Sequence, residues 1–139
     1  MNRFVLDNSM TMSWCFDDEA DERTEAVLTA LEEGEAIVPP IWALEVVNAL
    51  LVAERKHRVS SAKAAAFLRV LGSLSIRGDA AAPHSPSEEL LTLARETGLT
   101  SYDASYLELA LRSKLPLASL DAPLRKAARA RGVALMPAD

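Results

Sequence analysis

The chain alternates short apolar runs with longer segments in which apolar residues recur every three or four positions. A short apolar run bounded by turn-forming residues is typical of a buried β-strand. An all-apolar strand suits the interior of a parallel sheet that is covered on both faces. Four such runs and one weaker candidate are predicted as strands: 4–6, 36–38, 117–120 and 133–136, with 75–77 as the weak one.

The longer segments predict helices, because their apolar residues fall on one side of a 3.6-residue period. These helices are expected over 10–16 (a short helix or turn), 22–33, 41–53, 62–74, 86–97, 101–111 and 123–131. Gly34, Gly98 and Gly132 each follow a helix, in the manner of a C′ glycine. Ser85 is the expected cap of the helix that begins at residue 86. The alternation of strands and helices favours an α/β fold with a mainly parallel central sheet.

The helix predicted over 41–53 is apolar on every side except at Glu45 and Asn48. A helix that is apolar all round is expected to be buried. Glu45 and Asn48 stand three residues apart, so both point to the same side. A buried carboxylate needs a partner, which can be an arginine in a structural ion pair or a metal ion.

Three more carboxylates occur where strands end or helices begin. Asp7 follows the first strand, Asp121 follows the run 117–120, and Asp103 lies in the first turn of a helix. Each has a structural alternative, since aspartate caps helices and favours the positive end of the helix dipole. In a doubly wound sheet, however, strand ends and the following helix starts face the same rim. All four acids can then converge there.

Four unpaired carboxylates in one crevice would repel one another strongly. A divalent cation removes this repulsion. Oxygen ligands without histidine or cysteine suit Mg²⁺ or Mn²⁺. Such an ion can activate water and stabilise charge on a phosphodiester.

Composition adds several constraints. The chain has 139 residues, half of them hydrophobic, which fits one domain spanning residues 1–139. The sequence contains no run long enough to cross a bilayer and no signal-peptide core. Cys15 is the only cysteine, so a reduced cytoplasmic location is expected. The net charge of −5 argues mildly against a general nucleic-acid binder, although basic residues cluster at 55–58 and 125–131.

Four short motifs together resemble the PIN-domain ribonucleases and, more narrowly, the VapC toxins of bacterial toxin–antitoxin pairs. They are Asp7-x-Ser9, Glu45 within 44–50, Tyr-Asp-Ala at 102–104, and Ser119-x-Asp121. The resemblance implies a three-layer α/β/α sandwich and Mg²⁺- or Mn²⁺-dependent cleavage of RNA. It also implies a homodimer and a VapB-like antitoxin whose tail occupies the active-site groove.

The resemblance also implies a role for each residue of the site. Asp7 and Asp103 would be the principal metal ligands, and Glu45 and Asp121 would complete the cluster directly or through water. Hydroxyl and amide groups would support them: Ser9, Ser119 and Asn48. Two positions depart from the family pattern, because Asn8 and Ser119 stand where alanine and threonine are more usual.

Two other functions remain open. A PIN fold can hold RNA or a protein without turnover, since fold does not dictate function. A metal-dependent phosphatase or DNA nuclease could use the same ligands. Apolar positions on the helices 41–53 and 62–74 exceed what a small sheet needs, which leaves room for an antitoxin helix in a groove.

Overall fold

The computed structural model describes residues 2–139, and its centre is a five-stranded sheet. The strands are β1 (Arg3–Leu6), β2 (Glu35–Val38), β3 (Ile76–Gly78), β4 (Leu117–Ala118) and β5 (Leu135–Met136). They lie in the order β3-β2-β1-β4-β5, and every neighbouring pair is parallel. The predicted parallel sheet is therefore confirmed, including its weak third strand.

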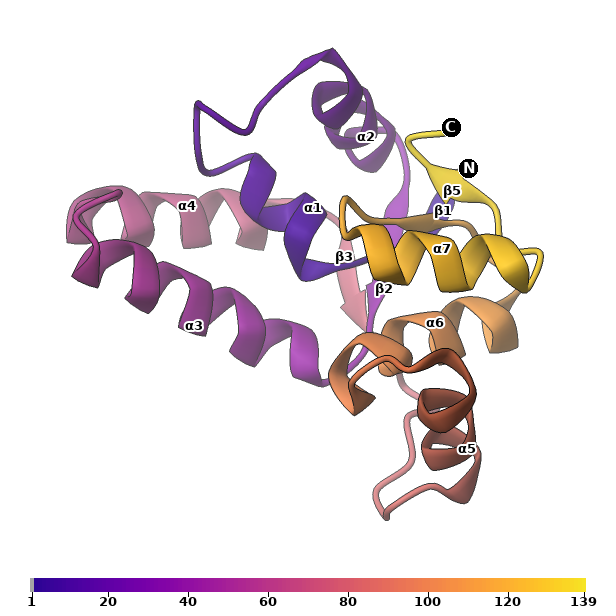
Figure 1. Cartoon of the computed structure of the whole chain (residues 1–139). Helices are drawn as coiled ribbons and strands as arrows, with labels where there is room; N and C mark the ends of the chain where they lie inside the picture. Colours follow the sequence, from indigo (N-terminus) through magenta and orange to yellow (C-terminus); the bar gives the residue numbers. More distant parts are fainter. Residues whose placement is uncertain (1) are drawn as a thin grey trace.

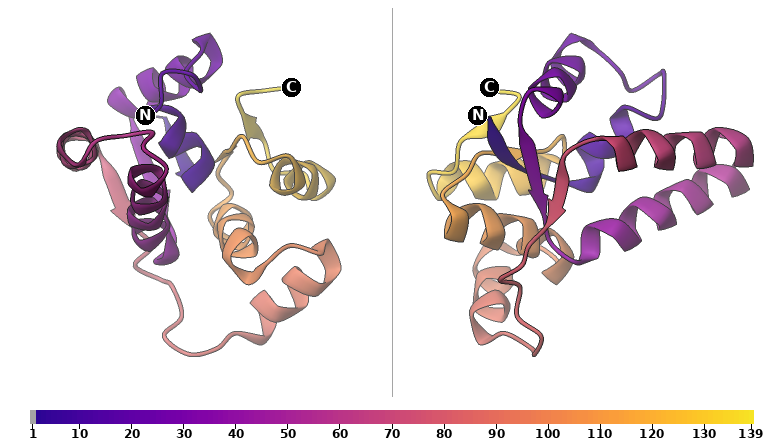
Figure 2. Two further views of the ribbon diagram at one scale, coloured as in Figure 1. Left: turned by 60° about the vertical axis from the view of Figure 1, so that its left-hand side comes forward. Right: turned by 180° about the vertical axis from the view of Figure 1, so that it is seen from behind.

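The helices cover the sheet on both faces (Figure 1). They are α1 (Asn8–Ser13), α2 (Glu22–Glu32), α3 (Ile41–Arg55), α4 (Ser61–Ser73), α5 (Glu88–Thr97), α6 (Ser101–Ser113) and α7 (Ala122–Ala130). Val5 packs against residues of α6 and α7, whereas its neighbours Phe4 and Leu6 pack with α1 and α2 on the opposite face. Figure 2 shows the sheet between these two groups of helices. The α/β/α sandwich is confirmed.

The prediction that the helix over 41–53 is buried on all sides is wrong. Only Val46, Leu50 and Ala53 of α3 are buried, and Leu44 on the opposite face is 68% exposed. Figure 1 shows why: α3 and α4 project together from the sheet as an antiparallel arm, so part of α3 extends beyond the elements that cover the sheet. An apolar composition did not imply an enclosed helix.

Two local predictions also differ from the structure. The cap of α5 is Ser87 and not Ser85: the Ser87 hydroxyl accepts a hydrogen bond from the Leu90 N–H (3.1 Å). Gly34 does not end α2 in the left-handed conformation that Gly98 and Gly132 adopt. A β-carbon at Gly34 would lie 2.0 Å from the carbonyl oxygen of Asn2, so glycine is needed there for a close backbone approach.

The topology creates one favoured place for a site. β2 and β3 lie on one side of β1, and the chain then crosses over so that β4 and β5 lie on the other side. In open parallel sheets, ligands bind outside the carboxyl ends of the strands at such a reversal of strand order. The residues that directly follow β1 and β4 therefore face the same crevice. None of the helices over residues 2–139 is both long enough and apolar enough to span a membrane.

Candidate active site

Asp7 lies at the carboxyl end of β1 and is almost completely buried, with 3% of its surface exposed. Its side chain caps α1 by accepting a hydrogen bond from the Met10 N–H (2.9 Å). Burial raises the pKa of this carboxyl from 3.8 to about 6, against the opposing effect of its hydrogen bonds. The predicted capping role is present, but a cap alone does not require burial.

Two serines hold the Asp7 carboxylate. The Ser119 hydroxyl donates to one oxygen (2.6 Å), and the Ser9 hydroxyl donates to the other (2.7 Å). The same hydroxyls accept hydrogen bonds from the backbone N–H groups of Asp121 (3.0 Å) and Leu120 (2.9 Å). The ends of β1 and β4 are thereby joined. β4 ends at Ala118, two residues earlier than predicted, as the chain turns into this network.

Asp121 caps α7 by accepting from the Leu124 N–H (3.0 Å), as its position predicts. Asp103 lies in the first turn of α6, with Thr100 as the cap. Burial is the main cause that raises the pKa of Asp103, and repulsion by Asp121 raises it further. Repulsion by Asp121 also raises the pKa of Asp7. Asp121 therefore lies close enough to Asp7 and Asp103 to disfavour the charge of both.

Glu45 reaches this group from α3. Its carboxylate accepts a hydrogen bond from the Tyr106 hydroxyl (2.5 Å), which rises from the buried side of α6. Burial raises the pKa of Glu45, and the charge of Asp103 adds to this effect. Burial also raises the pKa of Tyr106, together with its bond to Glu45, so the phenol stays protonated as a donor. Asn48 is exposed one turn further along α3.

Tyr106 is the residue that the sequence analysis did not single out. It occurs in a run of apolar residues and resembles ordinary core. The available signal was its spacing, because it stands three residues after Asp103 and so lies near that carboxylate on α6. Only the packing of α3 against α6 brings its hydroxyl to Glu45.

The lack of cationic partners distinguishes these four acids from other shielded carboxylates. Buried Glu35 pairs with Arg3 (3.3 Å) and Arg77 (2.8 Å), and the shielded carboxylate of Asp79 pairs with Arg112. By contrast, within residues 2–139 no lysine, arginine or histidine forms an ion pair with the four acids, namely Asp7, Glu45, Asp103 and Asp121. No positively charged side chain of the described residues therefore offsets the repulsion among the four carboxylates.

The donor set fits a hard divalent cation in its chemistry. Carboxylate oxygens are the ligands that Mg²⁺ and Mn²⁺ prefer, and no thiol or imidazole is among these residues. In their present positions, however, no three histidine, cysteine, aspartate or glutamate side chains of the described chain are arranged to hold a metal ion. Binding would therefore require these side chains to move toward one another.

Two cavities border the strand ends. One, of about 330 Å³, is lined by residues of α3 together with Asn8 and Tyr102, and Glu45 lies in its wall. The other, of about 390 Å³, contains Ser9 and the basic residue Lys56. Both are lined by Asn8 and Ala49, so the two cavities adjoin.

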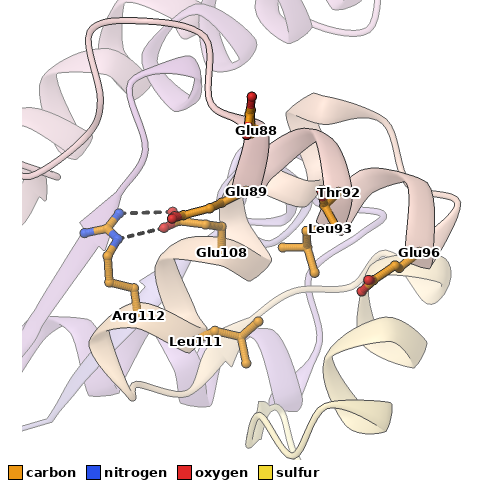
Figure 3. Close-up of a pocket in the computed structure, with 8 residues that line it drawn as sticks. All are labelled: Glu88, Glu89, Thr92, Leu93, Glu96, Glu108, Leu111 and Arg112. Atoms are coloured by element: carbon orange, nitrogen blue, oxygen red, sulfur yellow. Dashed lines mark hydrogen bonds and ion pairs between the residues drawn. The ribbon is translucent and has the colours of Figure 1, made fainter.

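A separate hollow of about 490 Å³ lies between α5 and α6 (Figure 3). Glu88, Glu89, Glu96 and Glu108 line it, but Arg112 binds Glu108 there. None of the four predicted acids lines this hollow. The candidate active site is therefore at the strand ends.

Comparison with known proteins agrees with this architecture. The family model described as "PIN domain" matches residues 4–130. The chain belongs to the PIN domain family. PIN domains are typically nucleases, so the acidic crevice lies in a nuclease fold.

Eleven chains of solved structures match this PIN domain, among them PAE2754 from Pyrobaculum aerophilum. That match has a TM-score of 0.73 and 25% sequence identity, and it covers 98% of this chain and 90% of the other. No curated protein sequence matches the chain.

Proposed function

We propose that this PIN domain, acting as one unit over residues 1–139, is a Mg²⁺- or Mn²⁺-dependent endoribonuclease and the toxin of a toxin–antitoxin pair. The observation that carries the proposal is a set of four acids: Asp7 and Asp121, which follow β1 and β4, Asp103 in the first turn of α6, and Glu45 on α3. They repel one another and have no cationic partner in the described chain. Perturbed carboxylates in a crevice mark a candidate functional site, and a hard divalent cation bound by their oxygens would remove the repulsion.

Asp7 and Asp103 would hold the metal, and Glu45 and Asp121 would complete its shell directly or through water. When bound, the ion supplies a Lewis acid for a phosphodiester and lowers the pKa of a water molecule. Asp7 is kept in place for this role by Ser9 and Ser119.

Tyr106 fixes one oxygen of Glu45, so that the second oxygen is left to accept a further hydrogen bond or to bind a ligand. This arrangement positions the carboxylate without neutralising it. The chain thus supplies oriented, uncompensated negative charge.

The direct test is cleavage of RNA by the purified protein with Mg²⁺ or Mn²⁺. Asp103→Asn should abolish cleavage, because it removes a ligand charge while keeping the shape of a half-buried side chain. Glu88→Gln, in the separate hollow between α5 and α6, is the matched control and should leave cleavage unchanged. If Asp103→Asn still cleaves RNA, the active site is not this cluster of acids. DNA and nucleotide substrates under the same metal would test the phosphatase and DNA nuclease alternatives.

The exposed apolar face of α3 supports the partner part of the proposal. Leu44, Val47 and Leu51 are 68%, 45% and 41% exposed, and Leu68 on α4 is 43% exposed. Such a surface fits an amphipathic helix of a VapB-like antitoxin or a second copy of the chain in a homodimer. A short upstream gene for a tailed DNA-binding protein would support the toxin role. A cytoplasmic location belongs to the same proposal.

One observation favours a second candidate, a PIN module that holds RNA or a protein without turnover. It is the arrangement of the acids, which do not form a ready metal site. Calorimetric titration with Mn²⁺ separates the two, since a nuclease should bind the ion with loss of binding in Asp7→Asn. A module without turnover need not bind it.

A further inference from the structure

The cavity beside Glu45 has a lining that the acidic cluster does not explain. Apolar side chains of α3 form part of its wall, and two amides and an aromatic ring lie there beside Glu45: Asn8, Asn48 and Tyr102. Its volume of about 330 Å³ falls at the lower end of the range for pockets that enclose small molecules. A metal ion with its water shell has no need of apolar walls or amides.

The amide of Asn8 is not used to hold the fold together. Its side-chain oxygen is buried and has no hydrogen-bond partner within residues 2–139, the only such atom in that part of the chain. An unpaired buried polar atom is unfavourable. Asn8 also lines the cavity, so a rotation of its side chain that brings this oxygen to a ligand there would be favoured. Asn8 directly follows Asp7, which puts this amide next to the acidic cluster.

Tyr102 supplies the aromatic component. It is 58% exposed, although aromatic side chains dominate protein cores, and it directly precedes Asp103 on α6. An exposed ring beside a nuclease site is suited to stack against a base, because every base has a π-face. Leu44, also largely exposed, lines the same cavity.

The adjoining cavity offers a path for the rest of the strand. Lys56 lines it and forms no ion pair within the described residues, whereas Arg58 there is bound by Asp18 (3.1 Å) and Glu19 (3.1 Å). Lys56 lines one of the two adjoining cavities and the Tyr102 ring lines the other, which matches what a single strand needs. Such strands are bound by positive charge along the backbone and by aromatic stacking of the bases.

We propose that the cavity lined by Asn8, Asn48 and Tyr102 is a nucleobase pocket that selects an unpaired base of RNA next to the acidic cluster. The base stacks on Tyr102, and its edge is read by the two amides, each of which can donate and accept hydrogen bonds. This inference rests on the proposed function, because it takes RNA as the ligand. It adds specificity-determining residues to the site.

The test measures binding and not cleavage. Asp103→Asn serves as the parent in every arm so that RNA stays intact, and affinity is measured by fluorescence anisotropy with Mn²⁺. The probes are short single-stranded homopolymers of A, C, G and U and a matched abasic strand. The parent should prefer one base over the abasic strand. Adding Tyr102→Ala should weaken binding of that base roughly 5- to 150-fold, and Tyr102→Phe should restore it.

Asn48→Ala should reduce the preference among the bases while the abasic strand binds as before, a pattern that a merely structural role would not give. Leu91→Ala, exposed on α5 and outside both cavities, is the control and should bind like the parent. Three results would overturn the proposal of a nucleobase pocket. They are an abasic strand that binds as tightly as the homopolymers, no binding of any strand, and an affinity that Tyr102→Ala leaves unchanged.

Cleavage by the wild-type protein is scored separately, so the two proposals can fail independently. Cleavage without Tyr102-dependent binding rejects the pocket and keeps the nuclease. Tyr102-dependent binding without cleavage supports the pocket and favours the module without turnover.

Discussion

Replacing Asp7 with asparagine should change the stability of the fold in opposite directions at neutral and acidic pH. Folding raises the pKa of Asp7 from 3.8 to about 6, with burial as the main cause. Between these values the folded chain binds a proton that the unfolded chain does not. Stability contributed by this group is therefore present below pH 3.8 and is lost as the pH rises through 6.

The gap between the two pKa values corresponds to about 3 kcal/mol of destabilisation at neutral pH. Asp7→Asn removes this cost, but an amide cannot accept all the hydrogen bonds from Met10, Ser9 and Ser119. One lost hydrogen bond costs about 1 kcal/mol. The variant should thus be more stable than the wild type by about 2 kcal/mol at neutral pH, or roughly 5–10 °C in Tm. Below pH 3.8 it should be less stable by about 1 kcal/mol.

Thermal unfolding is followed by circular dichroism across this pH range with a chelator present. It measures the difference in Tm between Asp7→Asn and the wild type, which should be positive at neutral pH and negative below pH 3.8. Asp139→Asn is the matched control: Arg129 and Arg125 lower the pKa of Asp139 to about 2, so its stabilising effect is present above 3.8 and lost on acidification. Added Mn²⁺ should then raise the Tm of the wild type but not of Asp7→Asn. A Tm difference between wild type and Asp7→Asn that does not vary with pH would refute the reasoning.

Two further predictions concern the scaffold. Gly34→Ala should destabilise the fold by about 1–3 kcal/mol in a denaturant titration, because the new β-carbon would overlap the carbonyl oxygen of Asn2. Gly72→Ala, within α4 and with no atom within 4 Å of the new β-carbon, should instead stabilise it by about 0.5–1 kcal/mol. Equal effects of Gly34→Ala and Gly72→Ala on the free energy of unfolding would contradict the close approach of Gly34 to the Asn2 carbonyl. Arg112→Ala should lower the free energy of unfolding by about 1–3 kcal/mol at neutral pH, since it leaves the shielded carboxylate of Asp79 without its partner. Arg112 holds the pKa of Asp79 below its usual value, so this loss should shrink at low pH.

Most of the scaffold was readable from the sequence because it depends on local periodicity. Short apolar runs and helical spacing give the parallel sheet with helices on both faces. Asp7 directly follows β1, and Asp121 caps α7 three residues after the end of β4. The parallel topology then requires these positions to share one edge. Local signals were least reliable at boundaries, where Ser87 rather than Ser85 caps α5.

The tertiary structure decided what depends on contacts between distant elements. The 41–53 segment is apolar throughout, but only the direction in which α3 leaves the sheet shows that Leu44 is exposed. Nothing local links Tyr106 to Glu45, which are 61 residues apart. Asn8 is one polar residue among many until packing buries its oxygen without a partner. Periodicity determines which residues face inward on each element, whereas the packing of one element on another determines which polar groups meet and which stay open to a ligand.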